Sequence, residues 1–142
     1  MKLLLLLLIV TYVYGQSCYI RQYTFSLLRN DNYEIHGLWP DVCCNSKEYP
    51  EFCRNVTFDL SKLKPIIQQL RSVWFPTTDI EKQNYLMKHE YLKHGSCSHY
   101  DLLTYFNVSL CLYNNVNLNK CHEKECLFTF IDNNLCNLTY DC

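Results

Sequence analysis

Two histidines, a glutamate and a lysine fall within six consecutive residues of this chain. The stretch HEYLKHGSC, residues 89–97, contains His89, Glu90, Lys93 and His94. On an α-helix these four side chains would share an arc of about 140°, because each residue turns the helix by about 100°. Such a face could move protons in acid–base catalysis, bind a metal ion, or be a solvated charged surface.

The spacing of the two histidines argues against a metal site. Zinc proteases with the pattern HExxH place their histidines four residues apart, on one side of a helix. Here the separation from His89 to His94 is five residues, so the two rings would diverge by about 140°. A solvated face is the usual explanation of a short run of charges, and this stretch alone does not decide between solvation and catalysis.

The rest of this helix indicates how it is held. Tyr91 and Leu92 point away from the ionisable arc, and we expect Tyr85 to join them against the core. Gly95 is placed to end the helix in a left-handed conformation, and Cys97 could fix the chain just beyond it.

A second stretch with chemical potential is IHGLWPD, residues 35–41. His36 lies at the end of an expected strand and precedes a glycine, so its ring is free to point into a cleft. Trp39 offers an aromatic face. Each residue also has an ordinary structural interpretation, as a hydrogen-bonded histidine and as a core tryptophan.

The hydrophobic pattern predicts three strands and three helices. Strands are expected at 22–27, 33–37 and 126–131, the last of them buried. Asp41 to Cys53 is expected to be a loop. The helices are expected at 60–74, at about 78–94 and from Leu102 to Tyr113. Strands mixed with helices, without regular alternation, predict an α+β domain.

Helix boundaries can also be predicted from the sequence. Pro65 is tolerable only near the start of the first helix, with Ser61 as a possible cap. Thr78 and Glu81 could form a capping box for the helix that carries the ionisable arc. Asp101 precedes the third helix.

The N-terminus indicates export. Met1 and Lys2 precede an apolar run that is shorter than the ~20 residues of a membrane-spanning helix, so we expect a signal peptide at residues 1–15. Residues 16–142 would then form a single domain without a membrane anchor. Three sequons, at Asn55, Asn107 and Asn137, agree with glycosylation of an exported protein.

The ten cysteines of an exported chain indicate a disulfide framework, although their spacing does not select the pairing. Thirteen basic and fourteen acidic residues give a net charge of −1, which becomes −2 without Lys2. This balance argues against a broad basic surface that coats nucleic acid, but it allows a local anion site. The twelve tyrosines include candidates for base stacking.

Taken together, IHGLWPD and HEYLKHGSC resemble the two active-site segments of the ribonuclease T2 family, in the same order. YPEFC at residues 49–53 and YDLLTYFNVSLCLYNN at residues 100–115 extend the resemblance, which covers about residues 33–113. The family implies a central antiparallel sheet with flanking helices, stapled by disulfides. This chain would be a short member, because little sequence follows the third helix.

The resemblance assigns roles to the ionisable residues. His36 corresponds to the family's general acid and His94 to its general base. Glu90 and Lys93 correspond to the residues that stabilise the pentacoordinate phosphorus, and His89 corresponds to a phosphate-binding histidine. Chemically, RNA supplies its own nucleophile, the 2′-OH, so the enzyme needs a base, an acid and a cation near the phosphate.

The resemblance also assigns the substrate-binding residues and one disulfide. Trp39, Asp41 and Tyr49 match positions that hold a base in some family members. A disulfide between Cys53 and Cys97 matches a family bridge.

Three features depart from the family pattern. Tyr91 replaces a tryptophan, and Leu86 and Met87 replace aromatic residues, which would weaken stacking of the downstream base. The loop after Asp41 contains adjacent cysteines, Cys43 and Cys44.

The leading hypothesis is therefore a secreted endoribonuclease that cleaves single-stranded RNA by transphosphorylation through a 2′,3′-cyclic phosphate. It would need no cofactor and no metal, and it would act as a monomer outside the cell or in an endomembrane, lysosomal or vacuolar lumen. Two alternatives stay open: a secreted effector or binding protein on a ribonuclease scaffold, and a metalloprotein that uses HExxxH.

Overall fold

The computed structural model describes residues 20–42 and 49–131 of the 142-residue chain. The predicted signal peptide, the adjacent Cys43 and Cys44 and the sequon at Asn137 lie outside these residues. No helix in the described part is long and apolar enough to cross a membrane.

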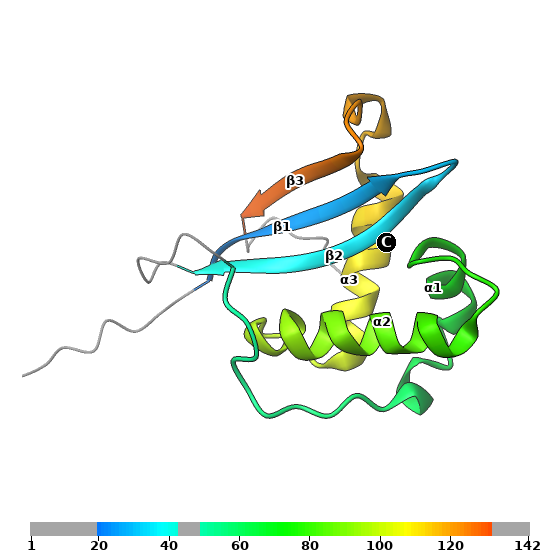
Figure 1. The fold of residues 1–142 in the computed structure, drawn as a ribbon. Helices are drawn as coiled ribbons and strands as arrows, with labels where there is room; N and C mark the ends of the chain where they lie inside the picture. Colours follow the sequence, from blue (N-terminus) through cyan, green and yellow to red (C-terminus); the bar gives the residue numbers. More distant parts are fainter. Residues whose placement is uncertain (1–19, 43–48, 132–142) are drawn as a thin grey trace, which may run out of the picture.

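The described strands form one antiparallel sheet in the order β2-β1-β3 (Figure 1). β1 spans Ile20–Arg29, β2 spans Tyr33–Val42 and β3 spans Glu125–Ile131. The central strand β1 places Tyr23, Phe25 and Leu27 in the core, where each is 0% exposed. The strand predicted at 22–27 is therefore confirmed, but its other face is buried as well, since Thr24 and Ser26 are 4% and 0% exposed.

Both edge strands differ from the prediction. β2 continues to Val42, five residues beyond its expected end at Gly37, and passes through Pro40. A proline is compatible with this position because an edge strand leaves one side of its backbone without partners. β3 was expected to be buried, but Leu127 and Ile131 are 56% and 59% exposed, because side chains alternate along the strand and only those of Cys126, Phe128 and Phe130 face the core.

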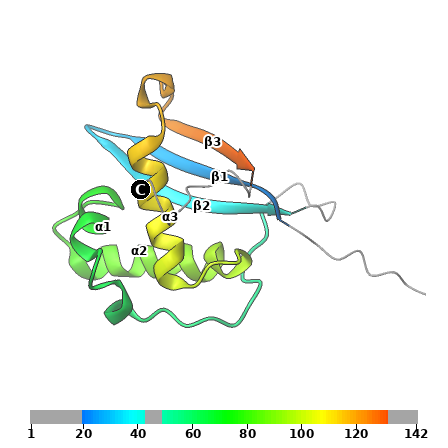
Figure 2. The same ribbon diagram turned by 180° about the vertical axis from the view of Figure 1, so that it is seen from behind.

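Three α-helices of the described residues flank the sheet. α1 spans Ile67–Val73, α2 spans Ile80–Lys93 and α3 spans Leu102–Asn115. α3 crosses one face of the sheet, and α2 lies beyond the β2 edge in both views (Figures 1 and 2). Short 3-10 helices occupy Leu60–Leu63, Gly95–Cys97 and Leu118–Lys120. The predicted α+β class, with an antiparallel sheet and flanking helices, is confirmed.

An aromatic cluster joins the helices to one another. Trp74 and Phe106 pack edge to face with ring centroids 4.7 Å apart, and Tyr91 contacts Tyr105 at 5.5 Å. The Tyr105 hydroxyl donates a hydrogen bond of 2.9 Å to the carbonyl of Leu38 in β2. Since Tyr91 lies on α2, this cluster fixes the side of α2 that faces the core and thereby the side that is left for chemistry.

The helix boundaries correct several predictions. Pro65 separates a 3-10 helix from α1, and Asp59 rather than Ser61 accepts the capping hydrogen bond. α2 is capped by Asp79, whose carboxylate accepts from the backbone N–H of Lys82, so the predicted Thr78–Glu81 capping box is wrong. Asp79 is one residue closer to the helix and accepts charge-assisted hydrogen bonds better than a hydroxyl does.

Two predictions at the ends of α2 are also wrong. Tyr85 is 65% exposed and stacks on His89, because four residues before His89 is only about 40° away around the helix. Gly95 does not adopt a left-handed conformation. Its role is close packing instead, because a Cβ at Gly95 would lie 2.5 Å from Cδ2 of Tyr91.

Candidate active site

A cavity of about 420 Å³ opens where β2, the loop after it and the end of α2 meet. It is lined by His36, Trp39, Tyr49, Glu51, Glu90, Lys93 and His94. Six of these seven residues were assigned a role by sequence reasoning, and the structure brings those six together from three separate segments.

His36 points into this cavity from an irregularity in β2. Ser26 of β1 pairs with Gly37, and the next residue, Leu27, pairs with Ile35, so His36 has no partner across the strand pair. This is a β-bulge, a feature that re-aims a side chain and is frequent beside active sites. The sequence prediction placed His36 at a strand end. It lies within the strand, and the bulge gives its ring the freedom that was attributed to a terminus.

Aromatic rings surround the His36 imidazole. Trp39 meets it edge to face at 5.1 Å, and Phe75, which follows α1, does so at 5.8 Å. Phe75 adopts a positive φ of 45° and was not singled out in the sequence. The imidazole is thus contacted by one ring from its own strand and by one ring from the segment after α1.

Trp39 and Glu90 connect β2 to α2. The indole Nε1–H of Trp39 donates to Glu90 Oε2 at 3.0 Å. Gly37 allows this contact, because a Cβ there would overlap both Trp39 Nε1 and Glu90 Oε2. The glycine of IHGLWPD is thus explained by close approach of the Trp39–Glu90 pair to the backbone rather than by freedom of the neighbouring histidine.

Glu90 is 6% exposed, and its burial raises the pKa of the carboxyl above its ordinary value of 4.5. The hydrogen bond from Trp39 opposes this rise, as do His36, His89 and Lys93 through their charges. The carboxyl therefore retains a proton to higher pH than a solvated glutamate does.

His94 ends α2 and is 6% exposed. Burial and, to a smaller extent, the cation on Lys93 lower the pKa of its imidazole from 6.5 to about 4. The carboxylate of Glu51 and the carbonyl of Pro50 act in the opposite direction. Burial is the largest of these effects, and the cation on Lys93 is the next.

Lys93 extends from the last turn of α2 and forms an ion pair with Glu51, with Nζ and Oε1 3.0 Å apart. Both side chains are partly solvated. Glu51 lies within the YPEFC stretch but was given no role by sequence reasoning, because a single acidic residue in a loop carries no distinctive signal. Its carboxylate occupies space beside the cation that an RNA phosphate would need.

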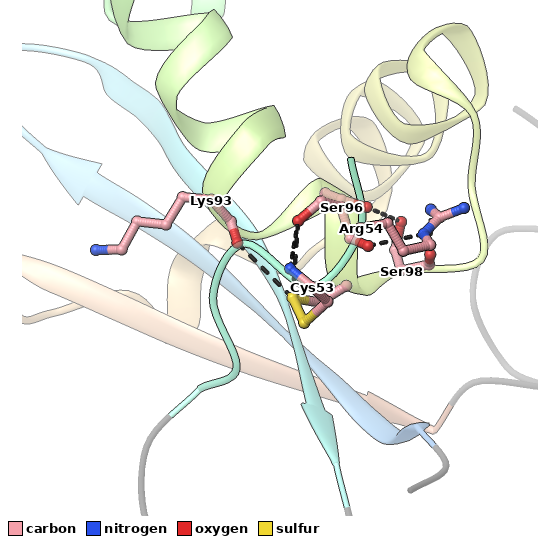
Figure 3. Close-up of a disulfide and its surroundings, with 7 residues drawn as sticks. Cys53, Arg54, Lys93, Ser96 and Ser98 are labelled. Carbon is pink, nitrogen blue, oxygen red and sulfur yellow. Dashed lines mark hydrogen bonds between the residues drawn. A yellow bond between two sulfur atoms is a disulfide. The ribbon is translucent and has the colours of Figure 1, made fainter. Parts of the chain in front are cut away.

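A disulfide joins Cys53 to Cys97, the pairing that the family resemblance implied. Hydrogen bonds reinforce the junction: Cys53 N–H donates to Ser96 Oγ at 3.0 Å, and the Arg54 guanidinium donates to the carbonyls of Ser96 and Ser98 (Figure 3). Lys93 extends its side chain away from the bridge in the same view. The loop that carries Tyr49 and Glu51 is thus anchored to the end of α2.

Two predicted binding residues do not line the cavity. Asp41, near the end of β2, accepts a hydrogen bond of 2.9 Å from Gln22 of β1. His89 stacks on Tyr85 along the outer side of α2, with centroids 6.3 Å apart. Tyr49 does line the cavity, where its ring lies 5.2 Å from that of Trp39 and its hydroxyl donates to Thr24 Oγ1.

Leu86 was expected on the catalytic side of α2. It lines a second cavity of about 330 Å³, together with Phe75 and Lys82. Phe75 also contacts His36, which lines the first cavity.

The remaining predicted sites are the glycosylation sequons, and a metal site was argued against. Asn55 is exposed in the loop after Cys53, whereas Asn107 is half-buried on α3 and Ser109 of its sequon is fully buried. Within the described ranges, no cluster of three or more histidine, cysteine, aspartate or glutamate side chains has the geometry to hold a metal ion.

Glu125 is the least expected member of the site. This residue begins β3 and places its carboxylate 2.8 Å from His36 Nδ1. It lies beyond residue 113, where the resemblance noted in the sequence analysis ends, and only the sheet order brings it near His36. The site as a whole combines two imidazoles, a buried carboxyl and an ammonium around one cavity, a set suited to acid–base chemistry on an anion.

Comparisons with known proteins agree with this chemistry. The model of the Ribonuclease T2 family matches residues 5–127. Ribonuclease DdI of Dictyostelium discoideum is 32% identical over 104 residues, which cover 68% of this chain and 43% of that protein. Human Ribonuclease T2 is 34% identical over 97 residues, which cover 63% of this chain and 35% of the human protein.

Solved structures are similar in fold. RNase NT in complex with 5′-AMP superposes with a TM-score of 0.60 and 22% identity over 72% of this chain and 60% of that one. Human RNase T2 superposes with a TM-score of 0.53 and 26% identity over 71% of this chain and 59% of that one. The chain spans less than half the length of the curated relatives described above.

Proposed function

Because the chain belongs to the ribonuclease T2 family, we propose that it is an endoribonuclease that cleaves single-stranded RNA by transphosphorylation, without a metal ion. The observation that carries this proposal is the cavity into which His36 and His94 converge from different elements, with Glu90 and Lys93 beside them. The substrate phosphate would lie between the two imidazoles.

His94 is the general base. Its low pKa, about 4, leaves the ring neutral over most of the acid range, so it can accept the proton of the 2′-OH. The attacking 2′ oxygen then forms a bond to phosphorus, which gives a pentacoordinate intermediate and afterwards a 2′,3′-cyclic phosphate.

His36 is the general acid. Its Nδ1 is engaged by Glu125, which leaves Nε2 as the nitrogen to protonate the departing 5′ oxygen. The 5′ oxygen leaves with this proton as the P–O bond breaks. A positioned acid and a positioned base each contribute about 10²–10⁴-fold to the rate.

Lys93 and Glu90 stabilise the phosphorus intermediate. The ammonium of Lys93 meets the negative charge that grows on the non-bridging oxygens. Glu90, whose raised pKa favours the protonated carboxyl, can donate a hydrogen bond to the same oxygens. The hydrogen bond that Glu90 Oε2 accepts from the Trp39 indole holds the carboxyl in place.

Trp39 and Tyr49 offer faces on which a base can stack, and stacking contributes about 1–3 kcal/mol per base with little sequence preference. Asp41 would contribute by orienting β2 at the margin of the site, and His89 by adding positive charge along α2. The charge of His89 already acts on Glu90 and His94.

The route of the protein through the cell is part of the same proposal. Residues 1–15 are a signal peptide, residues 16–142 form one domain, and the product is a secreted or lumenal monomer with sugars at Asn55, Asn107 and Asn137. An apolar N-terminal run, the disulfides and the sequons support this assignment.

The test is digestion of single-stranded RNA by the purified protein in EDTA, with analysis of the product ends. We expect 2′,3′-cyclic phosphates that open to 3′-phosphates, and no cleavage of DNA, which lacks the 2′-OH. His36→Ala and His94→Ala should each remove most activity. Cleavage of DNA at an equal rate, 5′-phosphate ends, or full activity in the double variant would contradict the proposal.

A further inference from the structure

We infer that Glu125 is a positioning residue for His36, holding its imidazole through Nδ1 so that Nε2 faces the reacting phosphate. The inference rests on the proposed function, because it assigns Glu125 a part in that reaction. It concerns a residue of β3, the last described strand, which lies outside the two stretches that suggested the chemistry.

One carboxylate oxygen carries the contact. Glu125 Oε1 lies 2.8 Å from His36 Nδ1 and accepts a second hydrogen bond, of 2.6 Å, from Ser26 Oγ. Ser26 is fully buried in β1, between the two edge strands. The carboxylate oxygen is therefore held by a hydroxyl of the central strand β1 and contacts an imidazole of the edge strand β2.

The backbone of β3 places this carboxylate with little freedom. Glu125 pairs with Leu28 of β1 at the first position of the strand ladder. Just before it, the carbonyls of His122 and Lys124 accept hydrogen bonds from Arg29. A disulfide between Cys121 and Cys126 closes the turn that leads into β3. Together these contacts fix the residue from which the carboxylate reaches across the central strand.

A carboxylate at Nδ1 has two effects on an imidazole. It holds the neutral ring in the Nδ1–H form, and it stabilises the imidazolium that a general acid requires. The contact also lowers the pKa of Glu125, for which Ser26 is the larger cause and His36 a smaller one. The carboxylate therefore stays ionised into the acid range, where we expect the enzyme to work.

Other groups also face His36. Glu90 approaches from α2, Trp39 and Phe75 contribute their rings, and the cavity walls carry Lys93 and His94. Among these, Glu90 is committed to Trp39 by its hydrogen bond. Glu125 is the carboxylate in direct contact with the ring.

A purely structural ion pair would behave differently. The side chains of His36 and Glu125 are 32% and 41% exposed, and pairs this accessible to water add little stability. We therefore expect Glu125→Gln to leave the melting temperature close to that of the wild type. The effect of the substitution should instead appear in the chemical step.

The kinetic test compares Glu125→Gln with Glu123→Gln. Glu123 is exposed in the same turn and loses the same charge, so it is the matched control. We expect kcat of Glu125→Gln to fall by about tenfold or more, with KM within about twofold, because Glu125 acts through His36 and not on RNA. An unchanged kcat in Glu125→Gln would overturn the inference.

A second measurement does not depend on cleavage. The ¹⁵N shifts of the His36 ring report which nitrogen carries the proton in the neutral form. We expect Nδ1–H in the wild type and in Glu123→Gln, and a mixed or Nε2–H ring in Glu125→Ala. An Nε2–H ring in the wild type would overturn the inference even if RNA is cleaved. If the wild type does not cleave RNA, the proposed function fails, and the ring shifts still decide the role of Glu125.

Discussion

At the scale of single residues, Glu51 and an RNA phosphate would compete for the same cation. Glu51 Oε1 lies 3.0 Å from Lys93 Nζ in the free protein, and both residues line the cavity. Binding of RNA would have to replace this pair with a contact to phosphate. Because both side chains are partly solvated, the pair itself is weak and can be exchanged.

We therefore predict that Glu51→Gln lowers KM for RNA, by about two- to fivefold, the factor that corresponds to a surface ion pair of up to about 1 kcal/mol. Lys93→Ala should instead lower kcat more than it raises KM, because the ammonium acts mainly on charge that develops in the transition state. Initial rates at several RNA concentrations measure both quantities. Glu81→Gln, an exposed residue in the first turn of α2, is the control for net charge.

A higher KM in Glu51→Gln would mean that the carboxylate helps to bind substrate. A change in KM alone for Lys93→Ala would reduce that residue to ordinary phosphate binding.

At the scale of elements, the active site depends on how closely β2 approaches α2. The contact is made by Trp39 and Glu90 over the backbone of Gly37. The aromatic cluster behind α2 and the Cys53–Cys97 disulfide prevent the helix from moving away to make room. The contact between β2 and α2 therefore has little room for additional atoms.

Gly37→Ala should destabilise the protein by about 1–3 kcal/mol, the usual cost of overpacking, and should displace Trp39 or Glu90. Urea unfolding measures the stability, and RNA cleavage measures the effect on the site. Trp39→Phe is the matched variant, because it removes the hydrogen bond without adding bulk. If Gly37→Ala had wild-type stability and activity, the close approach would have no functional meaning.

The sequence predicted the elements better than it predicted their irregularities. The central strand, the helix that carries the ionisable residues and the start of the third helix after Asp101 follow from local patterns, and the structure contains each of them. The bulge at His36 and the continuation of β2 through Pro40 do not, because they depend on which strand pairs with β2 and on which side. Tyr85 was predicted on the wrong side of α2, because it lies only about 40° from His89 around the helix.

At the scale of the whole molecule, two buried groups of the site make the free energy of unfolding change with pH in opposite directions. His94, with a pKa of about 4 against an ordinary 6.5, binds a proton less readily in the folded state than in the unfolded chain. Stability from this group is complete above about pH 6.5 and is lost as the pH falls towards 4. Glu90, with a raised pKa, binds a proton more readily when folded, so its contribution is complete below 4.5 and is lost as the pH rises.

We predict that His94→Gln loses less stability than the wild type between pH 7 and pH 4, by at most about 3 kcal/mol, whereas Glu90→Gln loses more. Urea unfolding at the two pH values, with the disulfides intact, measures these differences. Asp59 and Asp101, whose pKa values are lowered by their helix-capping contacts, titrate below this range and do not mask the effect. Parallel curves for the wild type and His94→Gln would show that His94 is not buried as a neutral ring.

The residues that complete the site from a distance lie beyond what local patterns can predict. Glu125 is brought to His36 by the order β2-β1-β3, and Phe75 is brought there by the packing of α1 against β2. Conversely, Asp41 and His89 are present in the right stretches but point elsewhere. Matching stretches locate the site in the chain, whereas the tertiary structure decides which side chains enter it.

The pH dependence of cleavage combines all of these groups. The base must be neutral and the acid protonated, so kcat/KM should be bell-shaped. The acid limb should lie near pH 4, because burial and Lys93 hold the pKa of His94 at about 4 in the free protein, and the optimum should therefore fall in the acid range.

Lys93→Ala should move this limb to higher pH, since it removes a cation, and Glu51→Gln should move it to lower pH, since it removes the carboxylate that raises the pKa of His94. The acid limb of the kcat profile should lie at higher pH than the acid limb of the kcat/KM profile, because bound phosphate also favours the protonated form of His94. Glu90, whose pKa is raised by burial, also interacts with His36 and Lys93, so both limbs are properties of the interacting set rather than of one residue. Initial rates from pH 3 to pH 9 in EDTA measure the profile. Rates that still rise at pH 9, in the wild type and in Lys93→Ala, would show that no histidine acts as the acid.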